Sequence, residues 1–183
     1  MITQRGSDVV RTQAFPSALS ASRIAVRVLI LGNLLFGGLV LALFLASLVA
    51  EDWVFRALGV RPGGGNATLF LWMRMVMVIG IGSVPFTYIL LTRLLAIVDS
   101  VRLGDPFVAG NAARLKTMAW ALLGLELLHL AVGVLAIGAL SNTQVDLDWS
   151  FSVTPWLAVL LLFVLAQVFD DGARMRDDLK GTV

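Results

Sequence analysis

Long uncharged stretches dominate the pattern of polar and apolar positions along the chain. Residues 28–50 and 149–169 carry no charge, and residues 69–92 and 117–140 each carry only one. A transmembrane helix needs about 20 predominantly apolar residues, and a helix satisfies its own backbone hydrogen bonds in lipid. The pattern therefore predicts an all-α membrane protein, a bundle of four transmembrane helices over these four ranges.

The remainder of the chain divides around these spans. Residues 1–22 mix polar and small side chains and are expected to form a cytoplasmic N-terminal arm. Residues 23–183 are expected to form one four-span membrane domain with a cytoplasmic C-terminal tail. No further domain boundary is predicted.

A different pattern precedes the fourth span. Apolar residues from Val145 to Val153 alternate with Asp146, Asp148, Ser150 and Ser152. This period of two favours a half-buried strand, so we expect a short β element in the outer loops. A single strand is not stable alone and needs a partner in a loop or in another subunit. The alternative is that the two carboxylates bind a cation, although two carboxylates alone make a weak site.

The basic residues predict the orientation. Eleven of them lie before the first span, between the second and third spans, or after the fourth, and only two lie in the outer loops. Cytoplasmic segments carry the excess of Lys and Arg, so both termini are expected in the cytoplasm. Because 12 of the 14 basic residues are Arg, we expect a bacterial source, and hence a multi-pass protein of the bacterial cytoplasmic (inner) membrane.

Composition narrows the possible functions. Hydrophobic residues make up 58% of the 183 residues, charged residues 14%, and mean hydropathy is +0.90, which excludes an ordinary soluble enzyme domain. Cys is absent and there is one His, and no phosphate-loop, dinucleotide or zinc-protease motif occurs. We therefore expect no catalysis, no cofactor and no metal site. The net charge of only +2 argues against direct nucleic-acid binding.

Polar residues inside the spans are the first candidate site. Glu126 lies near the middle of the third span and His129 follows it by three positions, which places both on one helix face. A charged side chain at the bilayer centre costs at least roughly 2.5 kcal/mol. Two interpretations stay open: a proton relay or ligand site, or a hydrogen-bonded Glu that holds helices together.

Depth along the helices selects possible partners for Glu126. At a rise of 1.5 Å per residue, Glu126 and Ser83 each lie about 14 Å from the cytoplasmic ends of their spans, and Asn33 about 8 Å from that side. Ser83 and Asn33 are therefore the expected partners. Arg74 lies about 8 Å from the outer end of its span. It is expected to extend outward, toward Glu51, Asp52 or the loop with Asp146 and Asp148.

The loop between the second and third spans carries the second candidate site. It contains Gly104, Asp105, Pro106 and Phe107, followed at fixed spacing by Asn111 and Arg114. The stretch G-D-P-F-x-x-x-N-x-x-R-L resembles the bacterial membrane-protein family called domain of unknown function 2975. The alternating loop before Thr154-Pro155 and the tail from Leu179 to Val183 are also similar to that family.

The resemblance implies a four-span bundle without an assigned activity. It also implies a gene that often lies beside a small helix-turn-helix regulator. Our functional hypothesis is a non-catalytic regulatory or interaction protein. Its cytoplasmic docking surface holds a soluble regulator and consists of the loop residues together with Leu179. The alternative is a small oligomeric transporter, channel or immunity-type protein that uses Glu126 and His129. The expected partners are the lipid bilayer, that soluble regulator and further copies of the chain.

Overall fold

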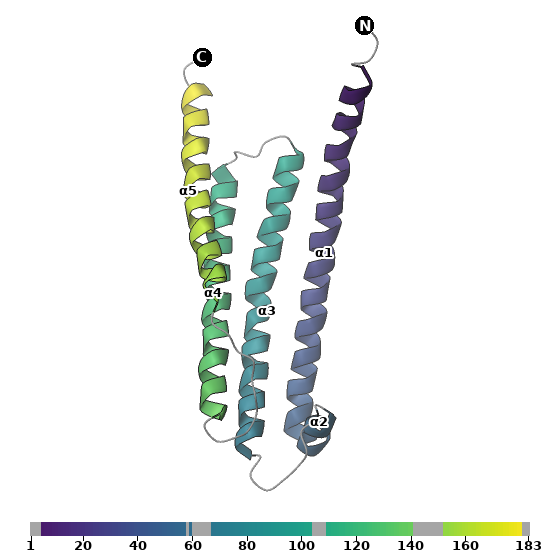
Figure 1. The fold of residues 1–183 in the computed structure, drawn as a ribbon, viewed down its shortest axis with the longest axis vertical. Coiled ribbons are helices and arrows are strands. Elements are labelled where there is room, and N and C mark those ends of the chain that lie inside the picture. Colours follow the sequence, from purple (N-terminus) through teal and green to yellow (C-terminus); the bar gives the residue numbers. More distant parts are fainter. Residues whose placement is uncertain (1–4, 58, 60–66, 104–108, 141–151, 181–183) are drawn as a thin grey trace.

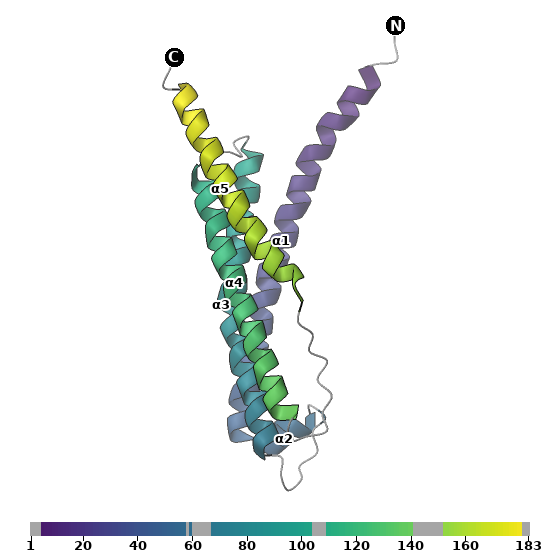
Figure 2. The ribbon, with the colours of Figure 1, turned by 60° about the vertical axis from the view of Figure 1, so that its left-hand side comes forward.

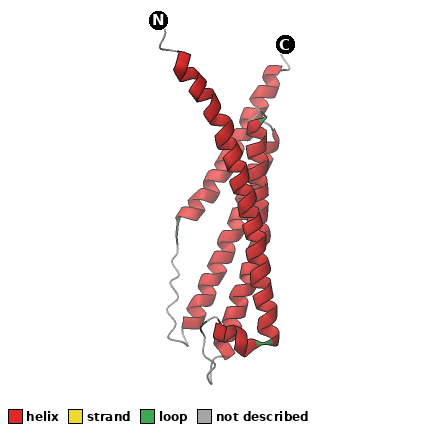
Figure 3. Ribbon diagram, turned by 90° about the vertical axis from the view of Figure 1, so that its right-hand side faces the viewer, coloured by secondary structure: helices red, strands yellow, loops and turns green. Residues whose placement is uncertain are grey.

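The computed structural model describes residues 5–57, 59, 67–103, 109–140 and 152–180. Within these ranges the regular secondary structure is entirely helical (Figure 3). The helices are α1 (Arg5–Val49), α2 (Glu51–Ala57), α3 (Ala67–Arg102), α4 (Ala109–Leu140) and α5 (Thr154–Lys180).

Four of these helices have the length and composition of membrane spans. Their apolar parts are Ser20–Val49, Phe70–Arg102, Gly110–Ile137 and Thr154–Arg176. Each covers most of one of the four stretches predicted from the sequence, and the fourth begins at Thr154 instead of residue 149. The prediction of four long apolar helices is therefore confirmed.

The long helices form an open row in the order of the chain (Figure 1). The extensive contacts are those of α1 with α3, α3 with α4 and α4 with α5. The first part of α1 and the last part of α5 diverge at the end where α3 turns into α4 (Figure 2). Each helix thus packs mainly against its neighbours in sequence, and the two outer helices do not close the row.

Glycines permit close approach at two of these contacts. A Cβ added at Gly37 of α1 would lie 2.7 Å from Cγ2 of Val84 on α3, and one added at Gly124 of α4 would lie 2.5 Å from Cε1 of Phe86. Helices in membranes commonly pack through small residues, because these let the backbones approach. The two glycines therefore set the spacing of the row around α3.

Most apolar side chains lie on the outside of this row. Only 6–17% of the most apolar stretch of each long helix is buried. Leu35 and Phe36 on α1 and Leu161 on α5 are all more than half exposed. Soluble monomers rarely expose continuous apolar surface of this extent.

The segment between α1 and α3 contains a helix that the sequence analysis did not predict. α2 begins directly after α1 with Glu51 and Asp52 in its first turn and ends with Arg56 in its last. Acids at the start and a base at the end favour a helix electrostatically. Val54 is fully buried against the rest of the chain. Gly59 follows with φ of 87° and donates its N–H to the Arg56 carbonyl, as glycines after a helix end commonly do.

The predicted strand receives no support. Residues 145–151 of it lie outside the described residues, and Ser152 and Val153 are not in a strand. The segment instead leads directly into α5, where the Ser152 hydroxyl accepts a hydrogen bond from the Thr154 N–H at 3.4 Å. A serine two residues before a helical N–H offers the local side-chain acceptor that favours a helix start.

The N-terminal region is helical. Residues 5–22 continue into the first apolar stretch as part of α1. At the other terminus, α5 runs on through the charged tail to Lys180.

Candidate functional site

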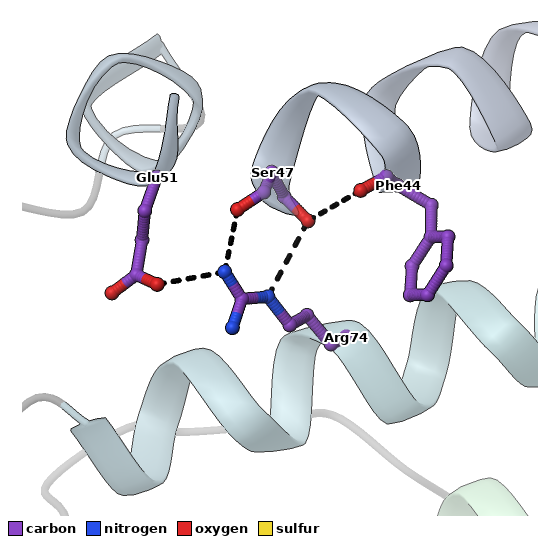
Figure 4. A network of polar contacts seen from close by, with 4 residues as sticks. All are labelled: Phe44, Ser47, Glu51 and Arg74. Atoms are coloured by element: carbon purple, nitrogen blue, oxygen red, sulfur yellow. Dashed lines mark hydrogen bonds and ion pairs between the residues drawn. The ribbon is translucent and has the colours of Figure 1, made fainter. Parts of the chain in front are cut away.

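Arg74 organises the corner where α1, α2 and α3 meet (Figure 4). Its Nη2 donates to the Ser47 carbonyl at 2.5 Å and to Oε2 of Glu51 at 2.7 Å, and its Nε donates to the Ser47 hydroxyl oxygen at 3.4 Å. The Ser47 hydroxyl donates in turn to the Phe44 carbonyl at 2.7 Å. The prediction that Arg74 reaches an acid of the loop after the first span is confirmed, with Glu51 as that acid.

The local sequence explains this arrangement. α1 ends at Val49 and α2 begins at Glu51, so the last carbonyls of α1 have no partner within the helix. The guanidinium of Arg74, with its several donors in a fixed fork, fills this gap at Ser47. Ser47 is fully buried, while the side chains of Arg74 and Glu51 are 25% and 43% exposed. The corner therefore serves as a polar clamp between helices.

The middle of the row does not bring Asn33 or Ser83 to Glu126. Asn33 donates its side-chain amide to the Val84 carbonyl at 3.1 Å, next to Pro85. Ser83 donates its hydroxyl to the Gly80 carbonyl within α3 at 2.7 Å. Neither of these two predicted hydrogen bonds to Glu126 is present among the described residues.

Ser83 and His129 do share a groove. It lies between α3 and α4, has a volume of about 240 Å³, and is otherwise lined by apolar side chains and Gly80. His129 is exposed and Glu126 is half-buried, and Glu126 does not line the groove. Within the described residues, no group of three or more His, Asp or Glu side chains could hold a metal ion.

A second polar network joins α3 to α4 near the turn between them. Asn111 is fully buried. Its amide donates to the Ser100 hydroxyl oxygen at 2.7 Å, and its carbonyl oxygen accepts from Nη1 of Arg114 at 2.8 Å. The same Nη1 lies 3.2 Å from the Ala96 carbonyl as a donor. Two residues of the predicted docking surface, Asn111 and Arg114, thus connect the two helices.

The other residues of that surface are placed less fully. Gly104, Asp105, Pro106 and Phe107 lie outside the described residues. Leu179 belongs to the last turn of α5. The structure therefore places Leu179 on the projecting end of α5, whereas the role of the loop motif stays a prediction from the sequence.

Two ion pairs also lie at this end of the described helices. Nε of Arg23 on α1 lies 3.1 Å from Oδ1 of Asp99 on α3, a contact that sequence reasoning missed. Arg23 lies before the first apolar stretch and Asp99 lies after the second, so no sequence motif connects them. Only a comparison of their positions along the axes of α1 and α3 could have predicted that they meet. Arg174 and Asp170, four positions apart on α5, form the second ion pair at 2.8 Å.

Comparisons with known proteins identify the family. A search of curated proteins and a search of solved structures each found no match. A family model described as "Protein of unknown function (DUF2975)" matches residues 34–183. This range covers the last third of α1 and all of α2, α3, α4 and α5, and the family agrees with the resemblance carried by the loop motif. The chain therefore belongs to the family of proteins of unknown function DUF2975.

Proposed function

We propose that this protein is a non-catalytic, multi-pass protein of the bacterial cytoplasmic membrane that binds a soluble cytoplasmic protein. Both termini and the turn between α3 and α4 lie in the cytoplasm in this proposal. The extensive exposed apolar surface of the four long helices supports the membrane location, and the distribution of basic residues supports the orientation.

The observation that carries the proposal is the continuity of α5. This helix runs from Thr154 through its apolar part into a charged part that ends at Lys180. The charged part projects beyond the adjoining ends of α3 and α4 (Figures 1 and 2). The Asp170–Arg174 pair supports this extension. A rigid helix that carries charges and the exposed Met175 offers a partner a preformed surface, which lowers the entropic cost of binding.

The partner class follows from the family resemblance. A membrane protein encoded beside a helix-turn-helix regulator would hold that regulator at the membrane through α5 and the loop with Phe107. Recovery of the partner from native membranes tests this proposal. We expect Phe107→Ala and Leu179→Ala each to reduce recovery, whereas Val49→Ala, which changes an exposed apolar residue at the opposite end, leaves it unchanged. Equal recovery with all three variants contradicts the docking surface.

Topology is tested separately with reporter fusions. A reporter attached after Val183 is expected to be active only in its cytoplasmic form. A periplasmic signal at that position contradicts the proposed orientation.

A second function is favoured by the groove that Ser83 and His129 share. Polar groups at mid-span mark ion or proton pathways in many membrane proteins. An open row of four helices encloses no pore, so this transport function requires several copies of the chain. Substitutions that abolish activity would then map to Glu126 and His129 and not to the charged end of α5.

A further inference from the structure

A larger groove lies between α4 and α5 at the end where α5 projects. Its volume is about 490 Å³, within the range typical of small-molecule sites. The α4 wall consists of Ala112, Ala113 and Lys116, and the α5 wall includes Phe163, Ala166 and Asp170. The three alanines leave the space, because a larger side chain at any of them would fill it.

The groove lies at the border between apolar and charged sequence on both helices. Lys116 is the last charged residue before the uncharged positions that follow it on α4, and Asp170 is the first charged residue after the long apolar part of α5. The ring of Phe163 lies on the apolar side and packs edge-to-face with Trp120, with ring centroids 5.5 Å apart. The lining is therefore apolar at one end of the groove and charged at the other. A lipid has the same arrangement, with an apolar acyl chain at one end and a charged headgroup at the other.

The two walls carry opposite charges. Within the described part of the chain, Lys116 makes no ion pair, and Asp170 pairs only with Arg174, through Oδ2 at 2.8 Å. The other carboxylate oxygen of Asp170 remains an acceptor. A ligand that satisfies both walls has an anionic group for Lys116 and a cationic hydrogen-bond donor for Asp170.

We propose that this groove binds the phosphoethanolamine headgroup of a diacyl phospholipid. The phosphate lies at Lys116, the primary ammonium donates to Asp170, and the glycerol and first methylenes lie against Phe163. The proposal rests on the membrane location proposed above. Two common alternatives fit this groove less well: phosphatidylglycerol offers Asp170 only neutral hydroxyl donors, and the quaternary ammonium of phosphatidylcholine has no hydrogen to donate.

Native mass spectrometry of the full chain extracted from membranes tests this proposal. The protein is equilibrated with equal amounts of phosphatidylethanolamine, phosphatidylglycerol and phosphatidylcholine. We expect phosphatidylethanolamine to be retained about tenfold over each competitor, as for loss of one charge-assisted hydrogen bond. Equal retention of the three lipids, or preference for phosphatidylglycerol, overturns the proposal.

Variants link the retained lipid to the groove. Lys116→Gln and Asp170→Asn are each expected to abolish the preference. Ala113→Trp, which fills the groove from an exposed position, should prevent retention. Matched controls are Arg93→Gln and Asp52→Asn, which change exposed charges outside the groove and should retain the preference. Circular dichroism and thermal unfolding verify that each variant is folded. An equal loss in the controls contradicts the site.

Two further measurements separate the sources of failure. Free phosphoethanolamine at the lipid concentration is expected not to displace the lipid, and full displacement would assign the groove to a soluble phosphate compound instead. Recovery of the protein from the soluble fraction would contradict the membrane location. Recovery from membranes without a lipid preference would contradict the groove alone.

Discussion

Nη2 of Arg74 lies 2.7 Å from Oε2 of Glu51, although 23 positions separate the two residues in the chain. The same nitrogen donates to the carbonyl of the buried Ser47. One guanidinium thus holds the end of α1, the start of α2 and the first turns of α3 in a fixed relation. We therefore expect the stability of this corner to depend more on the Arg74 side chain than on either acceptor.

Substitution of Arg74 tests this dependence. Arg74→Ala is expected to lower the free energy of unfolding by about 1–3 kcal/mol, because it leaves acceptors on two helices without their donor. Glu51→Gln should cost less than about 1 kcal/mol, since its carboxylate is partly exposed and screened by solvent. Thermal unfolding in detergent measures both. Similar effects of the two variants would show that the ion pair, and not the bond to Ser47, dominates the corner.

Close approach at Gly37 gives a second prediction. Gly37→Ala should destabilise the α1–α3 contact by roughly 1–3 kcal/mol through overpacking, because the new Cβ meets the stiff side chain of Val84. Gly38→Ala is the matched control, since a Cβ there meets nothing within 4 Å. It should be neutral or stabilising by up to about 1 kcal/mol from helix propensity. Equal effects of the two variants would contradict the close approach.

The buried Asn111 gives a third prediction. Asn111→Ala removes a donor to Ser100 and an acceptor of Arg114, and should cost about 1–3 kcal/mol because buried polar groups lose their partners. Thermal unfolding of this variant is compared with that of Thr117→Ala, which removes only an exposed bond to the Ala113 carbonyl. A cost no larger than that of the control would mean that solvent replaces the Asn111 network.

Glu126 gives a fourth prediction. Glu126→Gln keeps the size of the side chain and should change the free energy of unfolding by no more than about 0.5 kcal/mol, because neither Asn33 nor Ser83 depends on this carboxyl. A large loss of stability would identify Glu126 as a structural lock. Stability that is unchanged, together with a lost transport activity, would favour the second function.

The uncharged stretches predict the four helices because their length alone is matched to the bilayer. Helical rise also predicts that Arg74 lies near the end of its span and extends toward an acid such as Glu51. These predictions succeed because they use only the axial coordinate of each residue.

The position of a residue along the helix axis does not say which way its side chain faces or which helices pack together. Asn33 and Ser83 lie near the expected depth of Glu126, but α1 packs on α3 and not extensively on α4. Asn33 therefore meets Val84, and Ser83 bonds within its own helix. The alternation around Asp146 and Asp148 likewise reports a local pattern, and it cannot supply the second strand that a sheet requires.

The open row also bears on the order in which the helices pack during synthesis. Because α1 packs with α3, α3 with α4, and α4 with α5, each main contact forms between a newly emerged helix and the long helix made just before it. No early helix has to wait for the last one, so native contacts can accumulate in the order of translation. Loops of short sequence separation close rapidly. A chain stopped after α4 would already contain the α1–α3 and α3–α4 contacts.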